Sequence, residues 1–229
     1  IFKSSTAVSG WKMFTNQTSD PANQVMELSD PNGVAARTDA FNGTLPTSSL
    51  FSLGTYSDVN NNGNDMIAYC FASVAGYSSI GSYTGNGSAN GPIINTGFEP
   101  AFVIIKRTDS SDNWSMTDNK RSSSNPRANA LFPNLTQSEL TSGYTVDYLS
   151  NGFQIKTTDN AMNANGGAYL YIAFASDASA APALPDSFAN KLYTGNGTTQ
   201  SITGLGFSPS FVWLKRRDGT GNHYLNDTI

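Results

Sequence analysis

The residues of this chain that could bind a metal ion lie in one Asn- and Gly-rich stretch. Asp58, Asn60 and Asn62 occupy alternate positions, and Gly63 follows them. Side-chain oxygens in this pattern form the first half of the calcium loop of an EF-hand, in which the glycine allows a sharp turn. The bidentate acid of that motif is missing, because Tyr69 stands at its position. The pattern therefore predicts either a calcium site or an ordinary Asn/Gly turn.

Residues for acid–base, nucleophilic or zinc chemistry are scarce. His223 is the one histidine of the chain, so neither a catalytic triad nor a zinc site has a recognisable pattern. Glycoside hydrolysis needs two acids on one wall of a cleft, and the glutamates do not recur in the repeated stretches described below. These glutamates are Glu27, Glu99 and Glu139. We therefore expect a protein that is not an enzyme.

Sugar binding has more support from the side chains. Lectin sites place an aromatic platform beside Asn and Asp groups, and aromatic residues stand next to asparagines in two stretches of the chain. The residues that could bind a ligand in this way are Asn113, Trp114, Asn222 and Tyr224. A tryptophan at this place could instead anchor a β-sheet core, which would bury it.

Asn-x-Ser/Thr triplets are acceptors for N-glycosylation in a host that has the machinery. The triplets of this chain begin at Asn16, Asn42, Asn86, Asn113, Asn134, Asn196 and Asn226. The chain is so rich in Asn, Ser and Thr that most of these triplets are expected by chance. They mark candidate sites without indicating that sugar is attached.

The elements that would position these residues follow a repeated pattern. The stretch Tyr83–Arg107 (YTGNGSANGPIINTGFEPAFVIIKR) recurs as Tyr193–Arg216 (YTGNGTTQSITGLGFSPSFVWLKR). The offset between the two is 109 positions at Lys106 and Lys215, whereas the N-terminal part matches the middle of the chain at an offset of 103. Self-similarity of this kind indicates repeated domains. Below, residues related by these offsets are called corresponding residues.

These offsets predict repeats of about 105 residues. The predicted divisions are a first repeat without its opening strands (1–76), a complete middle repeat (77–178), a Pro/Ala linker (179–187) and the opening half of a third repeat (188–229). The two incomplete repeats would each expose a face that a neighbour could cover. Either a longer tandem array or completion between subunits would supply that neighbour.

Short apolar stretches and frequent turn residues predict an all-β fold. Asn151-Gly152 lies between two alternating stretches and is the strongest hairpin signal of the chain. Residues 102–106 are apolar on both faces, so we expect a central strand there. Strand spacing and turn density indicate tandem antiparallel β-sandwiches, jelly-roll or lectin-like in kind.

The charge pattern argues against two classes of partner. Charged residues make up 13% of the chain and the formal net charge is −4, so we expect no nucleic-acid partner. No stretch approaches the length of an apolar membrane span, so we expect no membrane insertion. Lys106 and Lys215, each followed by arginine, end apolar stretches. We expect both lysines to be solvated strand ends.

The most specific residues of the repeated pattern are Gly206-Phe207, Pro209, Phe211–Lys215 with Arg216, Asn222–Leu225 and Asp227. On these residues, nearly the whole chain resembles a repeated domain of unknown biochemical role found in tail-fibre-like and other large virion proteins of phages from aquatic bacteria. The resemblance implies a structural or adhesive fibre with a lectin-like sandwich. It supplies no catalytic residue.

The sequence leads to one main expectation and one alternative. We expect a non-enzymatic structural protein that forms an extracellular or virion-surface fibre or filament from end-to-end repeats, with no cofactor unless calcium binds. Its partner would be another copy of itself, bound head to tail, and strands from a neighbouring subunit could complete a truncated repeat. The alternative is a multivalent carbohydrate-binding adhesin whose partners are surface glycans. Exposed aromatic residues at corresponding positions would favour the adhesin, and buried tryptophans the scaffold.

Overall fold

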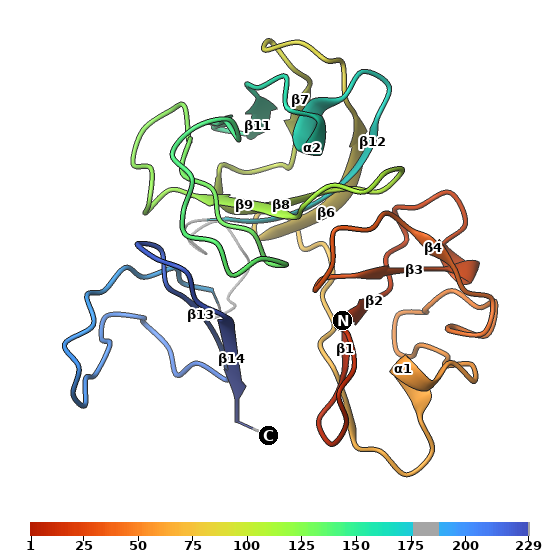
Figure 1. Ribbon diagram of the computed structural model, residues 1–229. Helices are drawn as coiled ribbons and strands as arrows, with labels where there is room; N and C mark the ends of the chain where they lie inside the picture. The colour runs from red at the N-terminus through yellow and green to blue at the C-terminus, as the bar shows by residue number, and fades with distance from the viewer. Residues whose placement is uncertain (176–187, 229) are drawn as a thin grey trace.

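The computed structural model describes residues 1–175 and 188–228, and antiparallel strands predominate in both ranges (Figure 1). The predicted linker, 179–187, lies outside these residues. The strands form sheets of five, four, three and two strands, so the expected mostly β character is confirmed. The helices within the described ranges are single turns: η1 (Pro21–Asn23), α1 (Ser57–Asn60) and α2 (Asn160–Asn163). None of them has the length or the apolar character needed to cross a membrane.

The first segment, residues 1–76, contains the five-stranded sheet, in the order β4-β3-β2-β1-β5. Its strands are β1 (Phe2–Ser4), β2 (Lys12–Met13), β3 (Gln24–Glu27), β4 (Ala35–Ala36) and β5 (Met66–Ala68). A small core lies on one side of this sheet, where the α1 residue Val59 is buried together with Phe2, Val25 and Phe41. The sheet and its core keep this short-stranded segment folded.

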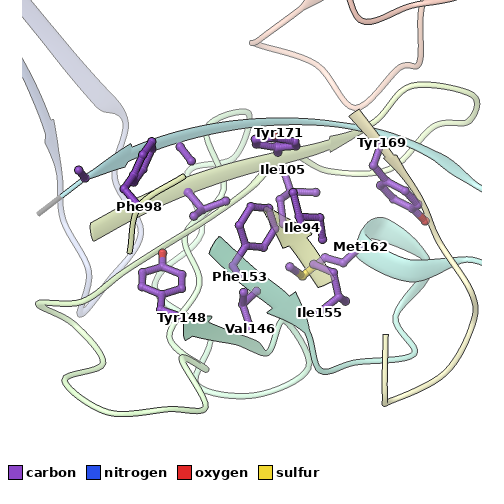
Figure 2. Close-up of a cluster of buried hydrophobic side chains, with 13 residues drawn as sticks. Ile94, Phe98, Ile105, Val146, Tyr148, Phe153, Ile155, Met162, Tyr169 and Tyr171 are labelled. Carbon is purple, nitrogen blue, oxygen red and sulfur yellow. The ribbon is translucent and has the colours of Figure 1, made fainter. Parts of the chain in front are cut away.

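The middle segment, described over residues 77–175, is a β-sandwich-like pair of sheets. The four-stranded sheet has the order β6-β12-β8-β9, and the three-stranded sheet has the order β10-β11-β7. The strands are β6 (Ser78–Thr84), β7 (Ile93–Asn95), β8 (Pro100–Arg107), β9 (Ser115–Asp118), β10 (Val146–Leu149), β11 (Gly152–Ile155) and β12 (Ala168–Ala175). Figure 2 shows Phe153 and Val146 of the smaller sheet directed toward Ile105 and Tyr171 of the larger one. These side chains form the core between the two sheets.

A hairpin is present where Asn151-Gly152 predicted one, but its two-residue turn is Ser150-Asn151, and Gly152 is the first residue of β11. Strands β10 and β11 pair with Leu149 opposite Gly152. Gly152 has a φ of 158°, and a Cβ atom there would lie 2.0 Å from the carbonyl oxygen of Ile94 in β7. Glycine is required here because β7 runs directly against the hairpin.

Strand β8 is central and buried on both faces, as its apolar sequence predicts. It pairs with β12 on one side and with β9 on the other. Val103 and Ile105 belong to the core between the two sheets. Ile104 instead belongs to a second cluster on the outer face of the four-stranded sheet. The four-stranded sheet is therefore covered on both sides.

The second cluster joins all three parts of the chain. The third segment, described over 188–228, contributes a two-stranded sheet of β13 (Phe211–Lys215) and β14 (His223–Asp227). Ile1, Ile104 and Trp213 are corresponding residues of the three segments, and all three pack in this cluster. Figure 1 shows the first segment (red to orange), the middle segment (yellow to cyan) and the third segment (blue) around a common centre.

Corresponding strands pair in the same register. Lys3 is paired with Ile67, and the residues 103 positions later, Lys106 and Leu170, are paired with each other in the same way. Phe102 is paired with Asp118, and the residues 109 positions later, Phe211 and Asp227, are again paired. The residues that connect these strands are consequently presented in the same way from each segment.

Candidate interface site

Lys106 is a completely buried lysine at the junction between the first and middle segments. Its ammonium group donates to three carbonyl oxygens, those of Arg107 at 2.7 Å, Asp112 at 2.9 Å and Pro31 at 3.0 Å. Burial lowers the pKa of Lys106 to about 8. A buried charge is costly unless hydrogen bonds replace its water. The expectation of a solvated strand end is wrong for this residue, because the first segment covers it.

Lys215 makes the corresponding contacts between the middle and third segments. Its ammonium group donates to the carbonyl oxygens of Gly221 at 2.8 Å and Thr136 at 2.9 Å. Lys3 donates in the same way to the carbonyl oxygen of Ser9 at 3.0 Å. In all three segments, one acceptor lies six positions after the lysine.

Two kinds of chain element meet at these junctions. We call residues 106–114 and 215–223, which connect β8 to β9 and β13 to β14, the receiving turns. We call residues 27–34 of the first segment and 132–139 of the middle segment the docking loops. Each docking loop lies against the receiving turn of the next segment along the chain.

Backbone hydrogen bonds attach each docking loop to its receiving turn at both ends. In each junction a receiving-turn N–H donates to a loop carbonyl, and a loop N–H donates to a receiving-turn carbonyl. The four bonds run from Asp112 to Pro31 at 2.9 Å, from Gly221 to Thr136 at 2.8 Å, from Val34 to Thr108 at 2.9 Å, and from Glu139 to Arg217 at 2.9 Å. The partners in the two turns stand 109 positions apart, and those in the two loops 105 apart.

A ring nitrogen makes a further contact in each junction. The Trp114 indole N–H donates to the carbonyl oxygen of Glu27 at 2.9 Å. The corresponding His223 has Nε2 at 2.8 Å from the carbonyl oxygen of Phe132. Trp213 donates its indole N–H to Nδ1 of His223 at 2.8 Å, so Nδ1 is the acceptor and Nε2 carries the proton. Burial lowers the pKa of His223, which favours this neutral tautomer.

Side-chain contacts differ between the two junctions although the backbone contacts agree. In the second junction Glu139 forms ion pairs with Arg217 at 2.9 Å and with Arg121 at 3.2 Å. In the first junction the same place is taken by Val34, which packs in the shared apolar cluster. The docking loops have no identical residue at matching positions. Sequence comparison therefore missed both loops, because main-chain atoms make their common contacts.

The four residues expected to bind a sugar differ in their exposure to solvent. Trp114 is completely buried, so it offers no aromatic platform to solvent. Asn113 is half-buried and accepts a hydrogen bond of 2.7 Å from Asn134. Tyr224 and Asn222 are exposed, and Asn222 alone of the four borders a cavity.

This cavity lies where the three segments meet and has a volume of about 230 Å³. Aromatic and polar groups from every segment line it. They include Trp11, Ser29, Asn134, Trp213, Asn222 and His223. A small polar molecule with one apolar face matches such a lining.

The residues of the expected calcium site have protein partners. Asp58 lies in α1, and its carboxylate stands 3.3 Å from the ammonium group of Lys12. Asn60 donates from its side-chain amide to the carbonyl oxygen of Gly54 at 2.7 Å, and Asn62 is exposed beyond the helix. Among the described residues, no group of three or more His, Cys, Asp or Glu side chains could hold a metal ion. Calcium binding at Asp58, Asn60 and Asn62 stays a prediction.

The candidate glycosylation sites fall into two groups. Five of the asparagines are exposed: Asn16, Asn42, Asn86, Asn196 and Asn226. The remaining two, Asn113 and Asn134, are half-buried and bonded to each other. A glycan at either of these two would have to break their contact.

The fold and the junctions define a mostly β protein whose segments are joined through main-chain atoms. The chain belongs to a family described as a domain of unknown function, DUF7483, whose model matches residues 1–178 and 184–229. No curated protein matches the chain. No solved structure matches it either.

Proposed function

We propose that this chain is a non-enzymatic structural segment of a fibre or filament on a virion or in the extracellular space. It is built from repeats of about 105 residues with a lectin-like β-sandwich fold. The proposal rests on one observation: corresponding main-chain and ring-nitrogen contacts join the first segment to the middle one and the middle one to the third. A contact between two different faces, made again by the next pair of units, allows an assembly to grow by adding units.

The junctions are strong enough to hold the units in a fixed relation. Each net hydrogen bond contributes about 1 kcal/mol, and the first junction has four of them. The buried Trp114 and the shared apolar cluster add the larger contribution of apolar burial. Such a join supports a mechanical role better than a loose linker would.

The test is the state of the native material. We expect a chain in its natural source that exceeds the 24.3 kDa of these residues and that electron micrographs show as part of a fibre or filament. A native chain of about 24.3 kDa that electron micrographs show as a compact monomer would overturn the proposal. Trp114→Ala, which removes a junction side chain, should reduce the fraction of assembled material.

The cavity between the segments supports a second candidate, a carbohydrate-binding adhesin. Trp11 and Trp213 place aromatic surface beside the side chains of Asn134 and Asn222, a combination that suits a sugar ring. A glycan array probed with the intact chain tests this candidate. Binding that Asn222→Ala weakens at least tenfold would favour the adhesin, because Asn222 is exposed and its loss should not unfold the chain.

A further inference from the structure

We propose that three segments of this kind close into a ring, and that residues 3–11, between β1 and β2, receive a third docking loop. The proposal rests on the proposed function, because it specifies how the repeats are arranged. The occupant is the docking loop of a third segment. In the sequence, it would lie as many positions after Asp227 as residues 132–139 lie after the corresponding Asp118.

The first and third segments touch each other directly, although the middle segment separates them in the chain. The Tyr69 hydroxyl donates to the carboxylate of Asp227. The rings of Tyr69 and Phe211 lie 4.9 Å apart between centroids. In an open array, two equal joins would place the middle segment between its neighbours. Contact between the outer two is what a rotation of about a third of a turn at each join produces.

The shared apolar cluster contains the place where the three segments converge. Ile1, Ile104 and Trp213 correspond to one another and pack in this single cluster. Units related by translation keep their corresponding residues one repeat length apart. Units related by rotation about a common axis bring them together. A join between two different faces closes into a ring when such a rotation returns to its start.

The first segment already presents the receiving turn that this ring requires. Lys3, Ser5, Ser9 and Trp11 correspond to Lys106, Thr108, Asp112 and Trp114. The internal contact of the turn is formed, because Lys3 donates to the carbonyl oxygen of Ser9. Within residues 1–175 and 188–228, no docking loop reaches the Ser5 carbonyl, the Ser9 N–H or the Trp11 indole N–H.

These groups state the chemistry of the occupant. Lys3 and the Ser9 N–H can share one backbone carbonyl, as Lys106 and Asp112 share that of Pro31. The Trp11 indole can donate to a second carbonyl, and the Ser5 carbonyl can accept from an N–H. A loop with the backbone path of 27–34 meets all of these requirements whatever its side chains are. In such a ring every receiving turn is occupied, so a fibre that contains it must grow through contacts between rings instead of through these junctions.

The decisive experiment extends the chain after Asp227 with its own residues 119–178, which complete a third segment in the corresponding register. Hydrogen exchange is then followed at the backbone amides. In the unextended chain, we expect the Asp112 and Gly221 amides to be protected and the Ser9 amide to exchange at least tenfold faster. In the extended chain, the Ser9 amide should become as protected as the other two.

A matched control carries proline at the added residue that copies Glu139, which removes the N–H destined for the Ser5 carbonyl. This control should reduce the new protection at Ser9. The added hairpin, copied from 146–155, shows whether the extension has folded. If its amides are protected while the Ser9 amide is not, the ring is overturned, but the proposed repeat fibre is not. Unprotected Asp112 and Gly221 amides in the original chain would overturn the junctions and the proposed function with them.

A second measurement uses the original chain, in case the extension does not fold. Tyr69→Cys and Phe211→Cys are introduced together with Cys70→Ser, and a short bismaleimide crosslinker is added. We expect an intramolecular crosslink in the monomer, whereas a control pair of Tyr69→Cys with Asn196→Cys should give none. Failure of the first pair to crosslink would contradict contact between the first and third segments.

Discussion

The indole N–H of Trp114 donates to the carbonyl oxygen of Glu27, 87 positions earlier in the chain. This bond connects a side chain of one segment to the main chain of another. The corresponding His223 makes the same connection to Phe132 through an imidazole nitrogen. The two side chains share only a ring N–H at the required place, which indicates that the donor, more than the residue type, is what the junction needs.

Trp114→Phe should lower the free energy of unfolding by about 2–4 kcal/mol. Phenylalanine removes the donor to Glu27, and its smaller ring leaves a cavity in a fully buried site. Urea denaturation measures the change. The matched control is Trp11→Phe, at the corresponding place in the first segment, where the indole is half-exposed. A cost for Trp11→Phe as large as that for Trp114→Phe would contradict the role of the junction bond.

Lys106→Met should destabilise the chain by about 1–3 kcal/mol at pH 7. Methionine fills the space, but three carbonyl oxygens lose their donor. The control is Lys120→Met, because Lys120 is exposed on the same segment.

Comparing the natural chain with Lys106→Met at different pH values tests the ionisation of Lys106. Burial lowers its pKa in the folded chain to about 8 from the ordinary lysine value of 10.5, so the folded chain releases this proton at a lower pH than the unfolded chain. Between pH 8 and 10.5 the unfolded state binds more protons, and stability from this group rises with pH. The stability difference between the natural chain and Lys106→Met should therefore grow in that range. A constant difference would mean that the lysine is solvated.

Acid should weaken the second junction through His223. Burial lowers the pKa of His223 below the ordinary histidine value of 6.5, so the folded chain binds a proton on this ring less readily than the unfolded chain does. Stability from the neutral ring is present above pH 6.5 and is lost as the pH falls through the folded pKa. Protonation of Nδ1 would also remove the acceptor for Trp213.

Denaturation at pH 7 and pH 5 measures this loss. His223→Gln keeps an N–H donor without an ionisable ring and should have a smaller difference between the two pH values. An equal loss in both proteins would assign the acid sensitivity to other groups.

Asn163→Ala should cost about 2–4 kcal/mol. Asn163 is fully buried, and its side-chain amide donates to the carbonyl oxygens of Ser88 and Thr157 at 2.6 and 2.8 Å. The side chain also accepts from the Asn86 N–H. Alanine removes all of these bonds and leaves the buried carbonyl oxygen of Thr157 without this donor. The control is Asn60→Ala at the corresponding exposed position, which loses one bond and should cost under about 1 kcal/mol. Thermal unfolding of the two variants makes the comparison.

Local patterns in the sequence predict the parts of the fold that local forces determine. The β10–β11 hairpin, within one residue of its predicted turn, and the central strand β8 are examples, because turn residues and apolar runs act over a few positions. The repeated stretches match in sequence, and the strands that they form pair in the same register.

The candidate site could be predicted only in part. Lys106 resembles any lysine at a strand end, and its burial depends on a loop that lies 75 positions earlier. The two docking loops have no identical residues at matching positions, because their common contacts use main-chain atoms. Trp114 could be placed as a core anchor or as a sugar platform, and only the arrangement of the segments decides for the core.

A join made by main-chain atoms has an evolutionary consequence. Every residue type except proline carries the same N–H and carbonyl, so a substitution in a docking loop keeps these main-chain hydrogen bonds wherever the side chain makes no contact of its own. For the repeats that we propose, such positions can diverge freely. Side-chain contacts such as that of Glu139 with Arg217 instead tie a docking loop to its own neighbour.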